Sequence, residues 1–81
     1  MASSARKRRA DKSRIVGRFL QDARGGTMRS EVEMSAGISS GYLCRLESGR
    51  RQPSVEVFIA ICKALRIAPD ALIRKISAAL D

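Results

Sequence analysis

Residues 37–49 read GISSGYLCRLESG. Gly37 closes one helical pattern and Ser40 opens the next, which is the stop and start chemistry of two helices joined by a tight turn. Within the second pattern, Leu43 and Leu46 are three positions apart, so they face a core together. The stretch therefore predicts two short helices packed against the rest of a small domain.

The opposite face of the second helix carries short polar groups, one basic side chain and no acid. Its members are Ser40, Gly41, Cys44 and Arg45, while Glu47 lies off this face near the helix end. Such a face is typical of a helix that lies in the major groove of DNA, where arginine pairs well with guanine O6 and N7. Inside a helix, Gly41 costs about 0.8–1.0 kcal/mol relative to alanine, which suggests a position of close approach.

Composition limits the class of protein. The 81 residues are enough for one domain with a modest core, and 44% of them are apolar. No apolar run reaches the length of a membrane span, and no apolar stretch follows the basic N-terminus as in a secretory signal. There is no histidine, and Cys44 and Cys62 have no metal-ligand spacing. We expect reduced thiols, a buried Cys62, no metal, no cofactor and a cytoplasmic protein.

Most of the net charge of +8 lies at the N-terminus. The first 14 residues hold six basic residues and one acid, and they contain no apolar period before position 15. We expect residues 1–12 to form a flexible basic arm and residues 13–81 to form the folded domain. Such a run can be a solvated tail, but a nucleic-acid arm agrees better with the domain behind it. The arm residues expected at DNA are Arg6, Lys7, Arg8 and Arg9.

Apolar periodicity predicts five helices and no strand. The first helix begins between Asp11 and Ser13 and stops at Gly25-Gly26, and Thr27 caps a second helix that ends at Ala36. The other three are expected at 40–48, at 55–65 after the Ser54 cap, and from the Ala68-Pro69-Asp70 start onward. The fourth is apolar nearly all round and is expected to be central.

Residues 37–54 resemble the Xre-like or lambda-repressor-like helix-turn-helix family of phage repressors and Cro proteins. The matching string is Gly-Ile-Ser-x-x-Tyr-Leu-x-x-Leu-Glu-x-Gly-x-x-x-Pro-Ser, and the match continues at Ala64-Leu65-x-Ile67 and Pro69-Asp70-x-Leu72. The resemblance covers roughly residues 16–75. It implies an all-α, five-helix domain that binds a palindromic operator as a homodimer, in a bacterial or phage-encoded protein associated with the nucleoid.

The resemblance also implies roles for single residues. Base reading falls to Ser40, Gly41 and Arg45. Contacts with the DNA backbone fall to Arg29, Ser39, Tyr42, Ser48, Arg50 and Arg51. In this interpretation Ser39 also caps the recognition helix.

The chain departs from the family pattern at several places. Thr27-Met28 reverses the family's order of an apolar residue followed by a cap, and the first turn has an irregular length. Glu33 stands where the family has a small residue, so this acid must turn to solvent or find a partner. The structural arginine that pairs with Glu47 in the family corresponds to Arg24 or to Gln21. The register that turns Val16, Leu20 and Ala23 inward favours Arg24.

The last helix carries an apolar stripe that includes Ile73, Ile76 and Leu80. This stripe either closes the core or, as we expect, forms a dimer interface. The predicted function is a dimeric, sequence-specific regulator of transcription on double-stranded DNA, a repressor or autoregulator of the phage, plasmid or restriction–modification controller type. The alternative is an antitoxin-like module that neutralises a partner protein and binds DNA secondarily. No phosphate loop or catalytic constellation points to an enzyme.

Overall fold

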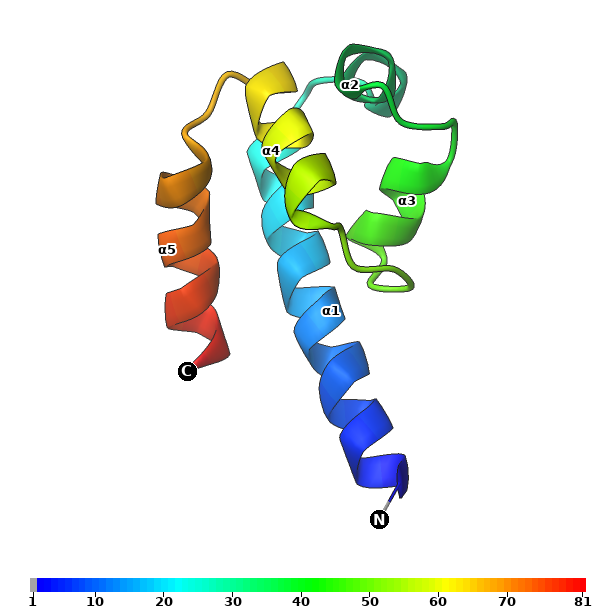
Figure 1. The fold of residues 1–81 in the computed structure, drawn as a ribbon, viewed down its shortest axis with the longest axis vertical. Helices are drawn as coiled ribbons and strands as arrows, with labels where there is room; N and C mark the ends of the chain where they lie inside the picture. The colour runs from blue at the N-terminus through cyan, green and yellow to red at the C-terminus, as the bar shows by residue number, and fades with distance from the viewer. Residues whose placement is uncertain (1) are drawn as a thin grey trace.

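The computed structural model describes the backbone of residues 2–81 and the side chains of residues 8, 9 and 11–81. Every regular element in this part of the chain is a helix, which confirms the all-α fold. The five helices are α1 (Ala2–Arg24), α2 (Arg29–Ala36), α3 (Tyr42–Glu47), α4 (Val55–Ala64) and α5 (Pro69–Leu80). Figure 1 shows α1 running through the middle of the molecule; α3 and α5 both pack on α1, and α2 packs on α4.

The first helix is longer than the sequence predicted. Instead of starting between Asp11 and Ser13 after a flexible arm, α1 begins at Ala2. The predicted start is wrong because it relied on apolar periodicity alone. Residues 2–16 contain neither Gly nor Pro and are rich in Ala, Arg and Lys, which are strong helix formers. We call residues 2–12 the basic extension; in Figure 1 this end of α1 projects beyond the other helices.

All five helices contribute to one apolar core. The core residues are Leu20, Val32, Leu43, Leu46, Phe58, Ile61, Cys62, Leu72 and Ile76. The inward direction of Leu43 and Leu46 and the burial of Cys62 are confirmed. The fourth helix supplies three of these residues, but Val55 in its first turn is 75% exposed. No helix among residues 2–81 is long and apolar enough to cross a membrane.

Helix starts are set partly by local and partly by distant groups. The predicted Ser54 cap of α4 is confirmed, because its hydroxyl accepts a hydrogen bond from the Val57 amide at 3.1 Å. Pro69 stands in the first turn of α5, as predicted. The predicted Thr27 cap of α2 is wrong. Met28 occupies the N-cap position and makes no side-chain cap, while the Thr27 carbonyl accepts a hydrogen bond from Arg24.

The crossing of α1 and α3 depends on Gly17, which the sequence did not single out. A Cβ at this position would overlap the carbonyl oxygen of Leu46 and would lie 2.6 Å from that of Glu47. Both of these atoms are backbone, so they cannot turn aside as the end of a side chain could. The absence of a side chain at Gly17 is therefore what lets the end of α3 approach α1.

We expect Gly17→Ala to lower the free energy of unfolding by about 1–3 kcal/mol, because the added methyl forces two helices apart. Urea denaturation checks this. Gly26→Ala is the matched control, since a Cβ there meets nothing within 4 Å and the φ angle is not positive. An equal effect of the two substitutions would show that the α1–α3 approach does not need Gly17.

Candidate nucleic-acid interface

The turn between α2 and α3 is formed by glycines in left-handed backbone geometry. Gly37, the C-cap of α2, has φ +71°, and the Ile38 amide returns to the Glu33 carbonyl at 3.0 Å. The predicted end of α2 is therefore confirmed. The third helix begins at Tyr42, two residues later than predicted, because Gly41 holds the N-cap position with φ +83°. Gly41 thus supplies a left-handed conformation at the N-cap, outside the helix interior where the sequence placed it.

The start of α3 is capped by a side chain from α2. Glu33 Oε2 accepts hydrogen bonds from the Gly41 amide at 2.9 Å and from the Leu43 amide at 3.3 Å. The expectation that Glu33 either faces solvent or is paired is resolved in favour of pairing, since the residue is 8% exposed. The predicted caps by Ser39 and Ser40 are wrong, because α3 has no side-chain cap from its own N-terminal segment.

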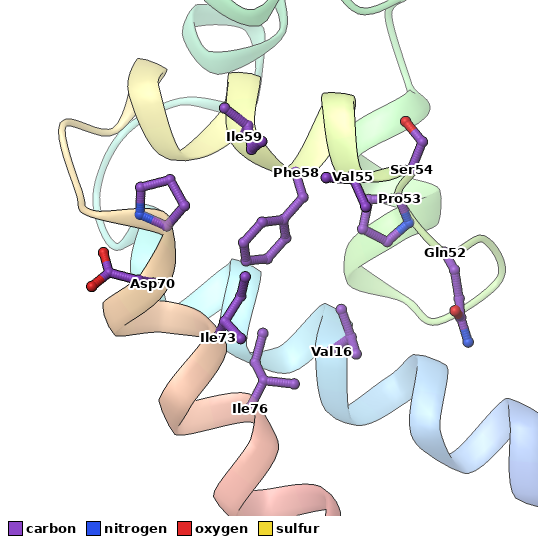
Figure 2. A pocket seen from close by; sticks show the side chains of 11 residues that line it. Val16, Gln52, Pro53, Ser54, Val55, Phe58, Ile59, Asp70, Ile73 and Ile76 are labelled. Atoms are coloured by element: carbon purple, nitrogen blue, oxygen red, sulfur yellow. The ribbon is translucent and has the colours of Figure 1, made fainter.

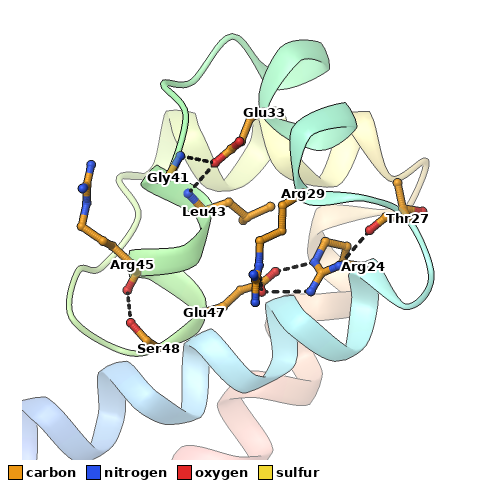
Figure 3. A network of polar contacts seen from close by, with 9 residues as sticks. All are labelled: Arg24, Thr27, Arg29, Glu33, Gly41, Leu43, Arg45, Glu47 and Ser48. Carbon is orange, nitrogen blue, oxygen red and sulfur yellow. Dashed lines mark hydrogen bonds and ion pairs between the residues drawn. The ribbon is translucent and has the colours of Figure 1, made fainter.

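The outward face of α3 presents the residues expected to read bases. Ser40, Gly41, Cys44 and Arg45 are all exposed. The Arg45 guanidinium lies 6.0 Å from the ring centroid of Tyr42, within the range of a cation–π contact. In Figure 3, Arg45 points away from the network on the inner side of the helix. The half-buried Tyr42 also packs against the core, so it gives Arg45 a fixed neighbour.

The inner side of α3 ends in a buried ion-pair network (Figure 3). Arg24 donates to the two carboxylate oxygens of Glu47, from Nε at 2.7 Å and from Nη2 at 3.1 Å. Arg29 Nε donates to Glu47 Oε1 at 3.0 Å. The assignment of Arg24, rather than Gln21, as the partner of Glu47 is therefore confirmed. This network joins the end of α1, the start of α2 and the end of α3.

The two arginines hold Glu47 in its charged form. Burial by itself raises the pKa of Glu47, but hydrogen bonds and charge from Arg24 and Arg29 outweigh burial and lower this pKa below its ordinary value. The hydrogen bond and the charge of Glu47 in turn raise the pKa of Arg29. The resemblance assigned Arg29 to a DNA phosphate. In the structure its Nε binds Glu47 within the fold, and the side chain stays 45% exposed.

The loop after α3 carries the next set of predicted phosphate contacts. Ser48, Arg50 and Arg51 are exposed, and the amides of Arg50 and Arg51 donate to the Arg45 carbonyl at 3.0 and 3.2 Å. The Ser48 hydroxyl donates to the same carbonyl at 3.2 Å. This carbonyl fixes the loop directly after the outward face of α3. Ser39, at the other end of α3, is also exposed.

The same loop is anchored to α1 close to the basic extension. Gln52 Nε2 donates to Ser13 Oγ at 2.8 Å, and Gly49, with φ +80°, leaves so little room that a Cβ would lie 2.7 Å from Arg14 Cγ. The basic extension therefore leaves the domain beside the loop arginines. Of its predicted DNA contacts, Arg8 and Arg9 are exposed, and the side chains of Arg6 and Lys7 lie outside the described residues.

The predicted dimer stripe on α5 is divided between the core and the surface. Ile76 is 7% exposed and belongs to the core, whereas Ile73 is 52% and Leu80 is 38% exposed. Beside Ile73 and Ile76 lies an apolar groove of about 480 Å³ (Figure 2). Its apolar lining includes Val16, Val55, Phe58, Ile59, Ile73 and Ile76.

The sequence did not identify how α3 is held at its start. A charged residue at a position where the family has a small one was the available signal for Glu33, but its partners are backbone amides eight and ten residues further along. Nothing in the sequence indicated that Arg29 also pairs with Glu47, because a phosphate contact alone was a sufficient reason for a basic residue at this position.

The chain belongs to the helix-turn-helix family, whose model matches residues 19–72. The resemblance to lambda-repressor-like proteins is thereby confirmed. Transcriptional regulator ClgR of Mycobacterium tuberculosis is 48% identical over 56 residues, which cover 65% of this chain and 49% of that protein. An uncharacterized helix-turn-helix transcriptional regulator of the same organism is 44% identical over 46 residues, which cover 57% of this chain and 32% of that protein.

A solved structure shares the fold. It is the clp gene regulator ClgR from C. glutamicum, which superposes with a TM-score of 0.77 at 25% identity and covers 86% of this chain and 94% of that chain. The chain spans about half the length, 49%, of the M. tuberculosis ClgR that it matches. The family and these relatives are helix-turn-helix transcriptional regulators and not enzymes.

We expect Glu47→Gln to lower the free energy of unfolding at pH 7 by about 2–3 kcal/mol, because a buried acceptor of two arginines loses its charge. The pKa of Glu47 is lower in the folded than in the unfolded chain. The charged Glu47 therefore stabilises the fold fully above the ordinary pKa of glutamate, about 4.3. This stabilisation is lost as the pH falls through the lower pKa that Glu47 has in the folded chain.

The difference between wild type and Glu47→Gln should thus shrink as the pH falls from about 5 to 3, as measured by urea denaturation at each pH. The exposed Glu56 gives the control substitution Glu56→Gln, for which a much smaller difference is expected. A difference that stayed constant over this pH range would contradict the charged state assigned to Glu47.

Proposed function

We propose that this protein is a sequence-specific, double-stranded-DNA-binding regulator of transcription that reads a palindromic operator as a homodimer. The observation that carries the proposal is the exposed, acid-free face of α3, which the Glu33 and Glu47 contacts hold from the other side. The transcriptional regulators among its relatives support this role. We further propose that it represses, since a dimer seated on an operator excludes other proteins from the same DNA.

Base reading in this proposal falls to Arg45, Ser40 and Gly41. Arg45 is exposed and contacts Tyr42, so its guanidinium is partly oriented before DNA arrives. A guanidinium that enters the major groove can donate to both O6 and N7 of one guanine. Ser40 adds a short hydroxyl, and Gly41 adds no side chain that would hold the backbone away from the groove.

Phosphate contacts in this proposal flank α3 on both sides. Ser39 and Tyr42 lie at its start, and Ser48, Arg50 and Arg51 follow its end. Arg29 keeps an exposed fraction of 45% and can contact a phosphate in addition to Glu47. The basic extension continues the positive charge beyond the loop, through Arg6, Lys7, Arg8 and Arg9, and such contacts add affinity with little sequence information.

Dimerisation in this proposal uses the apolar groove and the exposed side of α5. The occupant is a second copy of this chain, because a two-fold axis lets Ile73 and Leu80 of each copy meet the groove of the other. Val55, exposed at the rim, adds to the same apolar surface. Ile76 belongs to the core and lines the floor of the groove. In this proposal the interface therefore uses Ile73 and Leu80, two of the three residues predicted from the sequence.

Arg45→Ala tests base reading. Selection from random duplex DNA first identifies the preferred site, and the substitution should then cost about 1–3 kcal/mol on that site and relax the preference at one base pair per half-site. Lys63→Ala, which removes an exposed charge from α4, should cost much less. Equal losses on the selected and on a scrambled duplex would show that Arg45 contacts only the backbone. Recovery of no preferred sequence would refute the proposed function.

Ile73→Asp tests the dimer. Sedimentation equilibrium should show a dimer of the wild type at micromolar concentration and a monomer of the variant, since an unpaired charge in an apolar contact is costly. Ala78→Asp is the control, because Ala78 is exposed on the same helix but turned by about 140° from Ile73. A wild-type monomer at concentrations that bind the selected DNA would exclude this interface.

A further inference from the structure

Glu33 is an acidic residue at a nearly buried position. It lies in α2 on the side that faces α3, next to the core residue Val32, and it is 8% exposed. A carboxylate taken out of water is costly unless hydrogen bonds replace its hydration. Its nearest partners in the structure are the amides of Gly41 and Leu43, at 2.9 and 3.3 Å from Oε2. Figure 3 shows Glu33 directed at the start of α3.

The third helix depends on this carboxylate because it has no cap of its own. It has six residues, and its N-cap, Gly41, has no side chain that could accept a hydrogen bond. A helix this short does not persist by its own hydrogen bonds, so contacts with other elements must hold it. Glu33 satisfies two of the amides that an N-terminus leaves unpaired, and its negative charge suits the positive end of the helix dipole.

The two ends of α3 are therefore fixed by different helices. Glu33 holds its start to α2, and Glu47 at its last residue is bound by Arg24 of α1 and by Arg29. Leu43 and Leu46 fix its inner face between these two points. Loss of the Glu47 contacts would free the end of the helix, whereas Glu33 is the side chain that hydrogen-bonds the turn carrying Ser40 and Gly41.

We propose that Glu33 is a positioning residue that sets the angle at which α3 presents its base-reading face, so that it determines sequence preference without touching DNA. This inference rests on the proposed function. The inference also means that the Gly41 and Leu43 amides at the start of α3 donate to Glu33 and not to a DNA phosphate.

The experiment compares Glu33→Ala, Glu33→Gln and the control Glu31→Ala. Glu31 is exposed in the first turn of α2, so the control removes the same charge without removing the contact with α3. Affinity is measured on the selected duplex and on a scrambled duplex, at a temperature where thermal unfolding shows each variant to be folded. Amide hydrogen exchange at Gly41 and Leu43 is followed by NMR in the same samples.

We expect Glu33→Ala to reduce the ratio of selected to scrambled affinity about tenfold, the loss that corresponds to one hydrogen bond to a charged group. Exchange at the Gly41 and Leu43 amides should accelerate. Glu33→Gln keeps a carbonyl oxygen at the same place and should recover part of both effects. Glu31→Ala should leave the ratio and the exchange unchanged.

An unchanged ratio with faster exchange would show that Glu33 only stabilises the fold, and it would overturn the proposal while leaving the proposed function intact. If Glu33→Ala is unfolded at the assay temperature, Glu33→Gln decides by the same two readouts. If the wild type itself prefers no duplex, the proposed function fails, and the role of Glu33 in specificity fails with it. Equal losses for Glu33→Ala and Glu31→Ala would assign the effect to charge alone and would also overturn the proposal.

Discussion

The Glu47 carboxylate accepts hydrogen bonds from Arg24 at the end of α1 and from Arg29 at the start of α2, and the position of α3 against the rest of the domain depends on this contact. Arg24 reaches both carboxylate oxygens and also donates to the Thr27 carbonyl, so one side chain fixes the link between α1 and α2 as well as the end of α3. A bidentate arginine suits this position because its planar guanidinium offers several donors in a fixed geometry, which a lysine does not. The contact with Gly17 then allows α3 to lie close enough to α1 for the ion pair to form.

A buried ion pair of this kind is weak evidence for stability, because the desolvation of its charges offsets much of their attraction. Its value here is geometric. Burial of Leu43 and Leu46 sets which side of the six-residue helix faces inward, and the directed hydrogen bonds at Glu33 and Glu47 add fixed points at its two ends. In this orientation Arg45 faces outward. The desolvation of these charged groups is thus accompanied by a defined orientation of α3 and of its outward face.

The sequence predicted those parts of the fold that local signals determine. Apolar spacing placed Leu43, Leu46 and Leu20 in the core, and the Ser54 and Pro69 starts followed from chemistry within a few residues. The errors arose where a distant group decides. Ser40 was expected to cap α3, but a carboxylate seven positions earlier in the chain does so, and no local pattern reports that geometry. The additional contact of Arg29 with Glu47 was not foreseen, because it depends on how α2 meets α3. The early start of α1 was missed for a different reason, because helix propensity without apolar spacing was taken as disorder.

The arrangement of charge explains why a fold with eight acids can present a surface suited to a polyanion. Glu47 at the end of α3 and Glu33, which caps the start of α3 from α2, are both buried, and each carboxylate accepts hydrogen bonds from donors within the protein. The basic residues of this region behave in the opposite way, since Arg45, Arg50 and Arg51 are exposed on α3 and its following loop. If Glu33 and Glu47 were turned outward, they would repel phosphates at close range, where charge interactions are strongest. The hydrogen bonds that hold α3 therefore also remove negative charge from the surface, so that one set of contacts provides both the position and the electrostatics that the proposed function requires.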